Sequence, residues 1–262
     1  FWNAWVTNIR WTTPHYLALM PLAFLIAVSY KTLGLFGLVA FFLPLLAARY
    51  SFQRYMDMRA IFLDTITSLA KALEAKDPYT RGHADRVSAL AVAIARQLGW
   101  PEQDLELIKY VGLLHDIGKI GIDDAILKKP GRFTREEYEE MKRHAEIGAE
   151  ILRDIQLLGK GAKWVRYHHE WYNGRGYPDS LRGEQIPLGA RILAVADAFD
   201  AMISHRPYKP ARSVEEARQE IERCAGTQFD PRVVRAFLRV TQQPELVERL
   251  KPVQKLALEK GD

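Results

Sequence analysis

The sequence predicts an all-α protein in which an apolar segment precedes a helical domain. Apolar residues recur at steps of three and four, which is the period of a helix with one buried face. Runs that alternate apolar and polar residues, as strands do, are not found in the sequence. Helix-start signals recur as well, with two capping boxes and one N-cap before proline. These signals are Thr134 with Glu137, Ser213 with Glu216, and Asp230 with Pro231.

The first fifty residues are far more apolar than the rest of the chain. Residues 16–30 and 33–48 are almost uncharged, with Lys31 between them. Each run is shorter than the roughly 20 residues that a spanning helix needs. We therefore expect residues 1–50 to form two closely joined membrane spans, or one span and a re-entrant piece, in contact with lipid. The alternative is a very apolar hairpin in the core of a soluble protein. Aromatic residues that suit a membrane interface flank the runs: Trp2, Trp5, Trp11, Tyr16, Tyr30 and Tyr50.

Basic residues follow the second apolar run. Arg49, Arg54 and Arg59 lie there, and the positive-inside rule places what comes next in the cytoplasm. The single cysteine agrees with a reducing compartment. The net charge of +5 is explained in part by these flanks, and no basic stripe with interleaved aromatic residues points to a nucleic-acid polymer. Because the chain begins with Phe1, we expect it to be part of a longer protein.

An amphipathic helix is predicted for the connecting residues 51–76. Apolar residues recur from Phe52 to Leu73 at steps of three or four, apart from a gap at Arg59. Asp77 should end this helix, because a residue before proline avoids helical angles. Two interpretations stay open: a parallel stalk that joins two chains in a homodimer, or the first helix of the following domain. Residues 77–262 are expected to form that domain around one core.

Five of the seven histidines fall in one ordered series with two aspartates. Imidazole and carboxylate are standard ligands of Fe, Mn, Zn and Ni. Seven such groups exceed the three or four protein ligands of a mononuclear site. The sequence therefore predicts two metals in one pocket, an arrangement typical of phosphate-ester chemistry. In chain order these residues are His83, His115, Asp116, His144, His168, His169 and Asp197.

The first His-Asp pair stands at the end of a mostly apolar stretch. Residues 105–119 are predicted to form a buried helix, and burying His115 and Asp116 costs free energy unless they are bonded or bind metal. Neighbours on a helix point about 100° apart. The pair therefore suits two metals, or a carboxylate that bridges them, better than one ion. The same reasoning applies to His168 and His169 if they lie on a helix.

Two motifs resemble those of the HD superfamily of metal-dependent phosphohydrolases. The string His115-Asp116-Ile117-Gly118-Lys119 is similar to its signature. Residues 168–178, HHEWYNGRGYP, resemble the second signature of the HD-GYP branch. The resemblance covers about residues 65–245. Other segments follow in the branch's order at residues 128–131, 184–187, 190–197, 206–209 and 226–231.

The resemblance implies a helical catalytic domain that hydrolyses the bacterial messenger cyclic di-GMP to linear pGpG, to GMP, or to both. With the apolar segment, this implies a protein of the bacterial inner membrane whose catalytic domain is cytoplasmic. Asp116 would bridge two divalent ions, Fe or Mn in preference to Zn or Ni, and a hydroxide between them would attack phosphorus. The implied metal ligands are His83, His115, Asp116, His144, His168, His169 and Asp197.

Three basic residues match positions with a role in the family. Lys119 would hold a scissile phosphate oxygen or assist the leaving group, beside Asp116 as the other catalytic residue. Arg206 and Lys209 would contact the substrate phosphate. The structural alternatives are a lysine at a helix C-terminus, favoured by the helix dipole, and a solvated basic turn.

The glycine-rich loop at residues 173–178 has the composition of a turn. By resemblance, Gly176, Tyr177 and Pro178 would frame the substrate mouth, with Tyr177 as a stacking surface for guanine. A purely structural turn is the alternative. Members with a third metal carry a glutamate four residues before the first histidine, and here that position is Tyr79. We therefore expect a binuclear site.

Three functions remain to be distinguished. They are a cyclic di-GMP phosphodiesterase, an HD phosphohydrolase acting on another nucleotide, and a non-catalytic receptor that binds a cyclic dinucleotide. Every expected ligand is present, which favours an enzyme over a receptor. Measuring metal content together with turnover distinguishes an enzyme from a receptor. A panel of substrates distinguishes a cyclic di-GMP phosphodiesterase from an HD phosphohydrolase acting on another nucleotide.

Overall fold

The structure is a computed structural model that describes residues 2–77, 82–129, 131–204 and 211–250, with side chains from Met20 onward. Within these ranges the chain is helical, and its only extended pairings are isolated bridges. The expected all-α class is confirmed. By compactness the chain divides into residues 1–63 and residues 64–262, which are described separately below.

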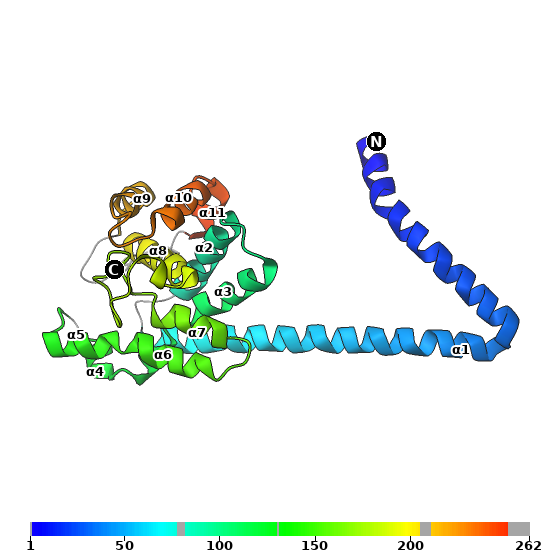
Figure 1. Ribbon diagram of the computed structural model, residues 1–262, viewed down its shortest axis with the longest axis horizontal. Coiled ribbons are helices and arrows are strands. Elements are labelled where there is room, and N and C mark those ends of the chain that lie inside the picture. Colours follow the sequence, from blue (N-terminus) through cyan, green and yellow to red (C-terminus); the bar gives the residue numbers. More distant parts are fainter. Residues whose placement is uncertain (1, 78–81, 130, 205–210, 251–262) are drawn as a thin grey trace, which may run out of the picture. The chain divides into compact units, whose positions relative to one another are not determined.

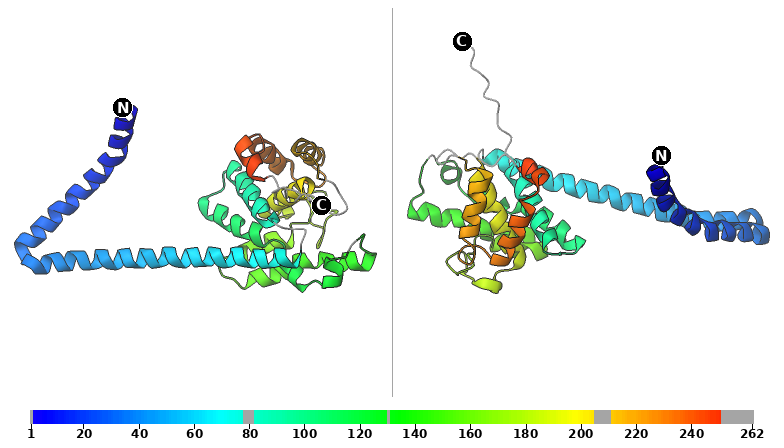
Figure 2. Two further views of the ribbon diagram at one scale, coloured as in Figure 1. Left: turned by 180° about the vertical axis from the view of Figure 1, so that it is seen from behind. Right: turned by 90° about the horizontal axis from the view of Figure 1, so that it is seen from above.

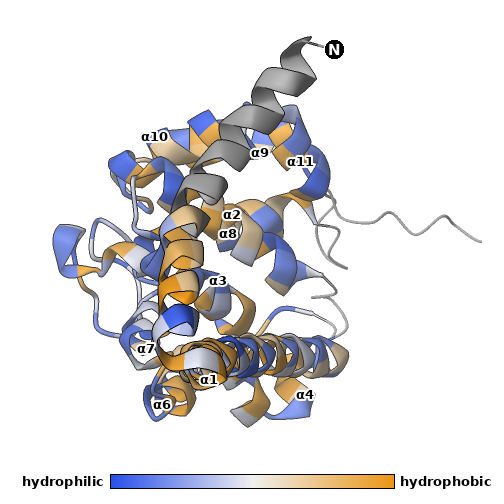
Figure 3. Ribbon diagram, turned by 90° about the vertical axis from the view of Figure 1, so that its right-hand side faces the viewer, coloured by the Kyte–Doolittle hydropathy of each residue, from blue (hydrophilic) through white to orange (hydrophobic). Residues whose placement is uncertain are grey.

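The first helix, α1 (Trp2–Lys76), is interrupted by one non-helical residue at Gly34 (Figure 1). Gly34 has φ 60° and ψ −143°, a conformation that is open to glycine because it lacks a Cβ. The stretch from Met20 to Lys76 is long and apolar enough to cross a membrane, judged by length and composition. Hydrophobic residues recur along α1 (Figure 3). Many of its large apolar side chains before residue 64 lie on the surface, with Leu35 73% and Phe36 78% exposed.

The end of α1 belongs to the second unit. Ile66, Ala70 and Leu73 are buried there at steps of four and three, as expected for an amphipathic helix. The helix predicted over residues 52–73 is confirmed, and α1 stops immediately before Asp77. The expected domain boundaries at residues 50 and 76 stay predictions.

The second unit is a bundle of short helices that wraps around the buried faces of α2 and α8 (Figures 1 and 2). The three predicted N-terminal caps begin α5, α9 and α10. The helices after α1 are α2 (His83–Gln97), α3 (Glu102–Leu114), α4 (Asp124–Leu127), α5 (Arg135–Lys142), α6 (His144–Arg153), α7 (Gly159–Arg166), α8 (Leu188–Ile203), α9 (Val214–Arg223), α10 (Pro231–Val240) and α11 (Pro244–Leu250), with short 3₁₀ helices η1 (Ile117–Gly121) and η2 (Gly183–Gln185).

The core of this unit forms where α2, α8 and α10 meet. Phe199 of α8 and Phe237 of α10 are fully buried, with ring centroids 5.1 Å apart. Leu90 and Ile94 line the buried face of α2. Each large apolar side chain buried in this way contributes about 1.5–3 kcal/mol of transfer free energy. The rigid packing of α2 on α8 places His83 and Asp197 on facing helices.

The helix predicted over residues 105–119 is wrong at its C-terminal end. Helix α3 stops at Leu114, and residues 117–121 tighten into η1. A Cβ at Gly118 would overlap the backbone of His144 and Gly148 on α6. This close approach turns the chain against α6 and brings the segment after α3 next to the first residue of α6.

Candidate metal centre

The residues expected to bind metal come from helix ends and from one helix face. His83 and His144 are the first residues of α2 and α6. His115 and Asp116 lie between α3 and η1. The pair at residues 168–169 lies in the turn that follows α7, so the condition that it is helical is not met. Asp197 alone projects from the middle of a helix, α8.

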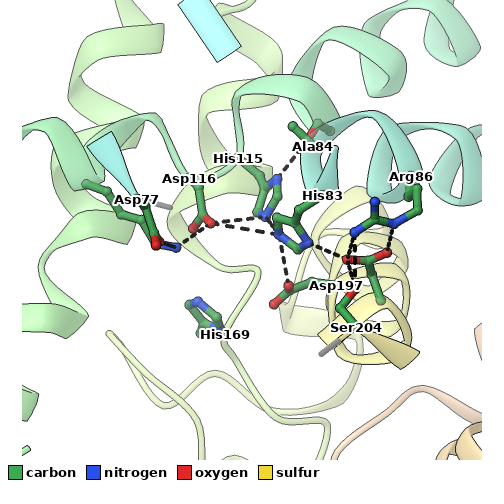
Figure 4. A network of polar contacts seen from close by, with 12 residues as sticks. Asp77, His83, Ala84, Arg86, His115, Asp116, His169, Asp197 and Ser204 are labelled. Atoms are coloured by element: carbon green, nitrogen blue, oxygen red, sulfur yellow. Dashed lines mark hydrogen bonds and ion pairs between the residues drawn. The ribbon is translucent and has the colours of Figure 1, made fainter. Parts of the chain in front are cut away.

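Three of these residues gather into a first group. His83, His115 and Asp197 each offer a ligand atom, and these atoms lie within 4.8 Å of one another. The Nε2 atoms of His83 and His115 are 3.3 Å apart. An oxygen of Asp197 lies 3.5 Å from Nε2 of His83 (Figure 4). Two nitrogens and one oxygen thus converge from the start of α2, the segment after α3 and the middle of α8.

Three histidines form a second group. His144, His168 and His169 offer ligand atoms that also lie within 4.8 Å of one another. Nε2 of His169 is 3.1 Å from Nε2 of His144. Nε2 of His168 is buried without a hydrogen-bond partner. Because a buried polar atom without a partner costs free energy, this nitrogen is explained by a ligand such as a metal ion.

Asp116 lies between the two groups. Its Oδ1 is 3.6 Å from Nε2 of His144, in the second group. Its Oδ2 is 3.7 Å from Nε2 of His115 and 3.9 Å from Nε2 of His83, in the first group. One oxygen of a single carboxylate therefore faces each group. Lys119 also contacts this carboxylate, with Nζ 2.7 Å from Oδ2.

Backbone carbonyl groups orient three of the imidazoles. Nδ1 of His115 donates to the carbonyl of Gly112 at 2.7 Å, and His144 donates to Met141 at the same distance. Nδ1 of His168 donates to the carbonyl three residues earlier at 2.6 Å. A carbonyl only accepts, so Nδ1 carries the proton and Nε2 keeps a lone pair for a metal. The donor set thus fits divalent transition metals.

A carboxylate that the sequence analysis did not single out orients His83. Asp200 lies one turn after Asp197 on α8, and its Oδ2 is 2.7 Å from Nδ1 of His83. Arg86 holds the same carboxylate through Nε and a terminal nitrogen, at 2.5 and 3.0 Å (Figure 4). Ser204 adds a hydrogen bond at 3.2 Å. The spacing of three residues places Asp200 on the same face of α8 as Asp197, but the sequence does not indicate its bond to His83.

The protonation states suit metal binding. Burial lowers the pKa of His115, His168 and His169, and it lowers the pKa of His144 to about 4. These four imidazoles are neutral at pH 7, which is the form that binds metal. For His83, burial also acts to lower the pKa, but the hydrogen bond to Asp200 and nearby carboxylates outweigh it, and the pKa is raised.

The charges around Asp116 keep it ionised. Burial alone would raise its pKa, but the charge of Lys119 and the nearby histidines hold the pKa well below the usual value. For Lys119, burial would lower the pKa, but Asp116 and Asp77 outweigh it and the pKa is raised. Asp77 lies 3.2 Å from the Lys119 ammonium. The structure therefore places a cation beside the carboxylate that lies between the two groups.

The glycine-rich loop packs against the second group. The ring of Tyr177 stacks on His169, with centroids 4.9 Å apart and an interplanar angle of 28°. The ammonium of Lys142 lies 5.5 Å from the centre of the Tyr177 ring. A Cβ on Gly176 would overlap backbone atoms of residues 169–171, so only glycine allows this approach. Glu170 accepts a hydrogen bond from the amide that follows Pro178, at 2.8 Å.

Two of the expected substrate contacts cannot be located. Arg206 and Lys209 lie outside the described residues, as does Tyr79. All seven expected metal ligands are described, and they are brought together in the two groups and the carboxylate between them. Gly176, Tyr177 and Pro178 lie in the loop beside them.

The sequence profile of the HD domain family matches residues 67–233. The chain is 45% identical over 186 residues to a cyclic di-GMP phosphodiesterase response regulator of Xanthomonas campestris, covering 70% of this chain and 49% of that protein. It is 43% identical over 194 residues to a cyclic di-GMP phosphodiesterase of Thermotoga maritima, covering 73% and 52%. It is 38% identical over 185 residues to a 3'3'-cGAMP-specific phosphodiesterase of Vibrio cholerae, covering 70% and 35%.

A solved structure of a cyclic GMP-AMP specific phosphodiesterase of V. cholerae has the same fold. The TM-score is 0.59 at 24% identity, covering 72% of this chain and 50% of that one. The chain spans about half the length of the first two curated relatives, with 49% and 52% of their lengths covered. The match over residues 67–233 covers well over half of the chain. The chain therefore belongs to the HD domain family, as its motifs predicted.

Proposed function

We propose that the chain is a metal-dependent phosphodiesterase that hydrolyses cyclic di-GMP to linear pGpG, to GMP, or to both. The observation that carries this proposal is the position of Asp116. One oxygen of its carboxylate faces His144, and the other faces His83 and His115. A carboxylate placed in this way suits a bridge between two cations, and paired cations are typical of phosphate-ester hydrolysis.

Each group of ligands would hold one divalent ion. His83, His115 and Asp197 supply one set, and the three histidines of the second group supply the other. Histidine nitrogens with carboxylate oxygens suit Fe or Mn, which we expect, and also accept Zn or Ni. When bound, the ions would supply positive charge to the phosphoryl oxygens and make a water molecule more acidic.

The chain's own residues would then bind and orient the substrate. The ammonium of Lys119, held by Asp116 and Asp77, would bind a phosphoryl oxygen. Tyr177 presents an aromatic ring beside His169, which suits stacking on a guanine base. Arg206 and Lys209 are expected to contact the substrate phosphate. These contacts favour a dianionic nucleotide with purine bases.

The choice of cyclic di-GMP over another cyclic dinucleotide rests on the relatives. The relatives of Xanthomonas and Thermotoga, at 45% and 43% identity, are named for cyclic di-GMP. A V. cholerae relative at 38% identity is named for 3'3'-cGAMP. The alternatives are therefore an HD phosphohydrolase acting on another nucleotide and a receptor without turnover.

The test is hydrolysis by the full chain, purified without oxygen and loaded with Mn²⁺ or Fe²⁺. Bound metal is measured, and cyclic di-GMP and 3'3'-cGAMP are followed separately by chromatography. We expect two ions per chain and faster turnover of cyclic di-GMP. Asp116→Ala is the control and should lose turnover and metal. Two bound ions with faster cleavage of 3'3'-cGAMP would favour the other enzyme, and two ions without any cleavage would favour the receptor.

We also propose that residues 1–50 hold the protein in the bacterial inner membrane, with the catalytic domain in the cytoplasm. The support is the large number of exposed apolar side chains within residues 20–50, among them Phe24, Leu43 and Leu46. In water these would form an unfavourable surface, whereas lipid would cover them. Arg49 and Arg54 follow on the side expected to be cytoplasmic.

Membrane attachment and dimer formation can be tested together. The full chain should sediment with membranes and be released by detergent, whereas a chain beginning at Phe52 should be soluble and bind metal. Aggregation of the shorter chain would contradict the assignment of residues 1–50 to lipid.

A homodimer through residues 51–76 predicts cross-linking between chains when single cysteines are placed along the exposed face of that segment.

A further inference from the structure

The end of α1 contacts two segments that carry the expected metal ligands. Three charged residues at or directly after the last turn of α1 make these contacts: Glu74, Lys76 and Asp77, here called the α1 end. The helix is anchored behind them by the buried side chains of Ala70 and Leu73. The proposed reaction uses only Asp77 of this cluster, as a partner of Lys119, and assigns no role to Glu74 or Lys76.

Glu74 holds the start of α2. Its Oε2 accepts a hydrogen bond from the amide of Gly82 at 2.9 Å, and its Oε1 accepts from the amide of Ala84 at 3.3 Å. The first amides of a helix lack partners within the helix, and the N-cap residue of α2 makes no side-chain hydrogen bond. Glu74 therefore replaces the missing cap, and its charge suits the positive end of the helix. His83 lies between the two bonded amides.

Lys76 holds η1. Its ammonium donates to the carbonyls of Lys119 at 3.3 Å, Ile120 at 3.0 Å and Ile122 at 3.0 Å. An ammonium group has three donors, so the three carbonyls use its full capacity. Asp124 adds an ion pair at 3.3 Å. The segment held in this way directly follows the metal-ligand pair at residues 115–116.

Asp77 extends the contact to the centre of the site. It is buried, and its Oδ2 lies 3.2 Å from Nζ of Lys119. Lys119 in turn lies 2.7 Å from the Asp116 carboxylate. A continuous series of charged contacts therefore runs from the α1 end to the carboxylate between the two ligand groups (Figure 4).

We propose that the α1 end is a positioning element that sets the spacing between His83 and Asp116, and through it the affinity for metal. The inference rests on the proposed function of the two ligand groups. Glu74 fixes the helix start that carries His83, while Lys76 and Asp77 fix the segment that carries Asp116. Because all three residues lie at or directly after one helix end, both ligand segments are fixed to the same point, and a displacement of that end changes the contacts that hold them at their spacing.

The experiment measures Mn²⁺ affinity of the full chain, with free Mn²⁺ followed by its electron paramagnetic resonance signal. Lys76→Met removes three hydrogen bonds and should weaken Mn²⁺ binding about 10-fold, as loss of outer contacts to metal ligands does. Lys76→Arg, which keeps the charge and donors, should restore most of the affinity. Lys71→Met, at an exposed position on the same helix, is the matched control and should bind like the unaltered chain.

A second variant separates positioning from folding. Glu74→Gln removes the charge but keeps an acceptor, so the chain should fold and still bind Mn²⁺ more weakly. The proposal is overturned if Glu74→Gln lowers the thermal midpoint but binds Mn²⁺ like the unaltered chain, or if Lys76→Met and Lys71→Met bind alike. An unaltered chain that binds Mn²⁺ but does not cleave cyclic di-GMP would refute the proposed function instead, because the comparison of Mn²⁺ affinities between variants does not depend on turnover.

Discussion

Asp200 accepts a hydrogen bond from Nδ1 of His83 at 2.7 Å, and this bond turns Nε2 of His83 toward Asp197 and His115. The carboxylate is itself held by Arg86. Burial would raise the pKa of Asp200, but the hydrogen bonds from His83 and Arg86 outweigh burial and lower it. Asp200 is therefore charged at neutral pH and fixes both the tautomer and the ring orientation of His83.

Replacing Asp200 should weaken metal binding without removing a ligand. Asp200→Asn keeps an acceptor but loses the charge, and we expect about 10-fold weaker Mn²⁺ binding, with a larger loss for Asp200→Ala. Affinity is measured by competition with a chelator. Asp104→Asn is the control, because Asp104 pairs with Lys160 on the surface at 2.7 Å. Equal affinities for the two asparagine variants would contradict the role of Asp200.

Lys119 should affect the rate more than metal loading. Lys119→Met removes the ammonium that lies beside Asp116, and we expect about a 100-fold lower kcat, typical of losing one group that stabilises charge in the transition state. Metal content at saturating Mn²⁺ should stay near that of the unaltered chain, because no ligand is removed. Lys109→Met, at an exposed position of α3, is the control. An unchanged kcat would mean that Lys119 does not act in the reaction and only forms an ion pair with Asp77.

The residues of the two candidate ligand groups could be singled out from the sequence because metal binding restricts the choice of residue. Few side chains bind transition metals, so His83, His115 and His144 are conspicuous in a chain with seven histidines. Asp200 could not be predicted in the same way. Its bond to His83 joins residues 117 positions apart and depends on α2 packing beside α8. Aspartates are common, and only tertiary structure tells this one from the others.

The end of α3 shows a second limit of the sequence pattern. Apolar residues continue past Leu114 to Ile117, so the helical period favoured a helix through residue 119. The helix ends earlier because Gly118 packs against the backbone of His144. This contact lies between elements that are distant in the chain. It also moves Asp116 off the helix, to where its two oxygens can face different groups.

The metal-free protein should be less stable at pH 5 than at pH 7.5. The pKa values of His115, His144, His168 and His169 are lowered in the folded chain, that of His144 to about 4. Below about pH 6.5 these histidines therefore bind more protons in the unfolded chain than in the folded one. The stability that their neutral forms give the folded chain is complete above that pH and is lost as pH falls toward 4. His83 has the opposite sign, because its pKa is raised and its contribution is lost as pH rises.

Thermal unfolding of the chain after treatment with EDTA measures this effect. Four histidines destabilise the folded chain as pH falls, and one stabilises it. The thermal midpoint should therefore be lower at pH 5 than at pH 7.5. His144→Gln removes one of the four histidines whose pKa is lowered, so the difference in thermal midpoint between pH 7.5 and pH 5 should be smaller in this variant. A midpoint that is higher at pH 5 than at pH 7.5 would mean that His83 outweighs the others.

Gly176 should control substrate affinity through Tyr177. In the structure Gly176 lies so close to the backbone of residues 169–171 that a methyl group at its Cα would overlap those atoms. Gly176→Ala must therefore displace the loop and separate the Tyr177 ring from His169, on which it now stacks. Stacking on an aromatic side chain is worth about 1–3 kcal/mol per base. We expect KM for cyclic di-GMP to rise about 10-fold, a change that corresponds to about 1.4 kcal/mol.

Two variants of Tyr177 separate the ring from its hydroxyl and from the loop. Tyr177→Phe keeps the stacked ring and should leave KM near that of the unaltered chain, whereas Tyr177→Ala should raise it as Gly176→Ala does. Metal content should be the same in all three variants, because no ligand atom is changed. If Gly176→Ala lowers metal content along with activity, the loop instead supports His169 itself. A normal KM for Tyr177→Ala would mean that the Tyr177 ring does not contact the bound nucleotide.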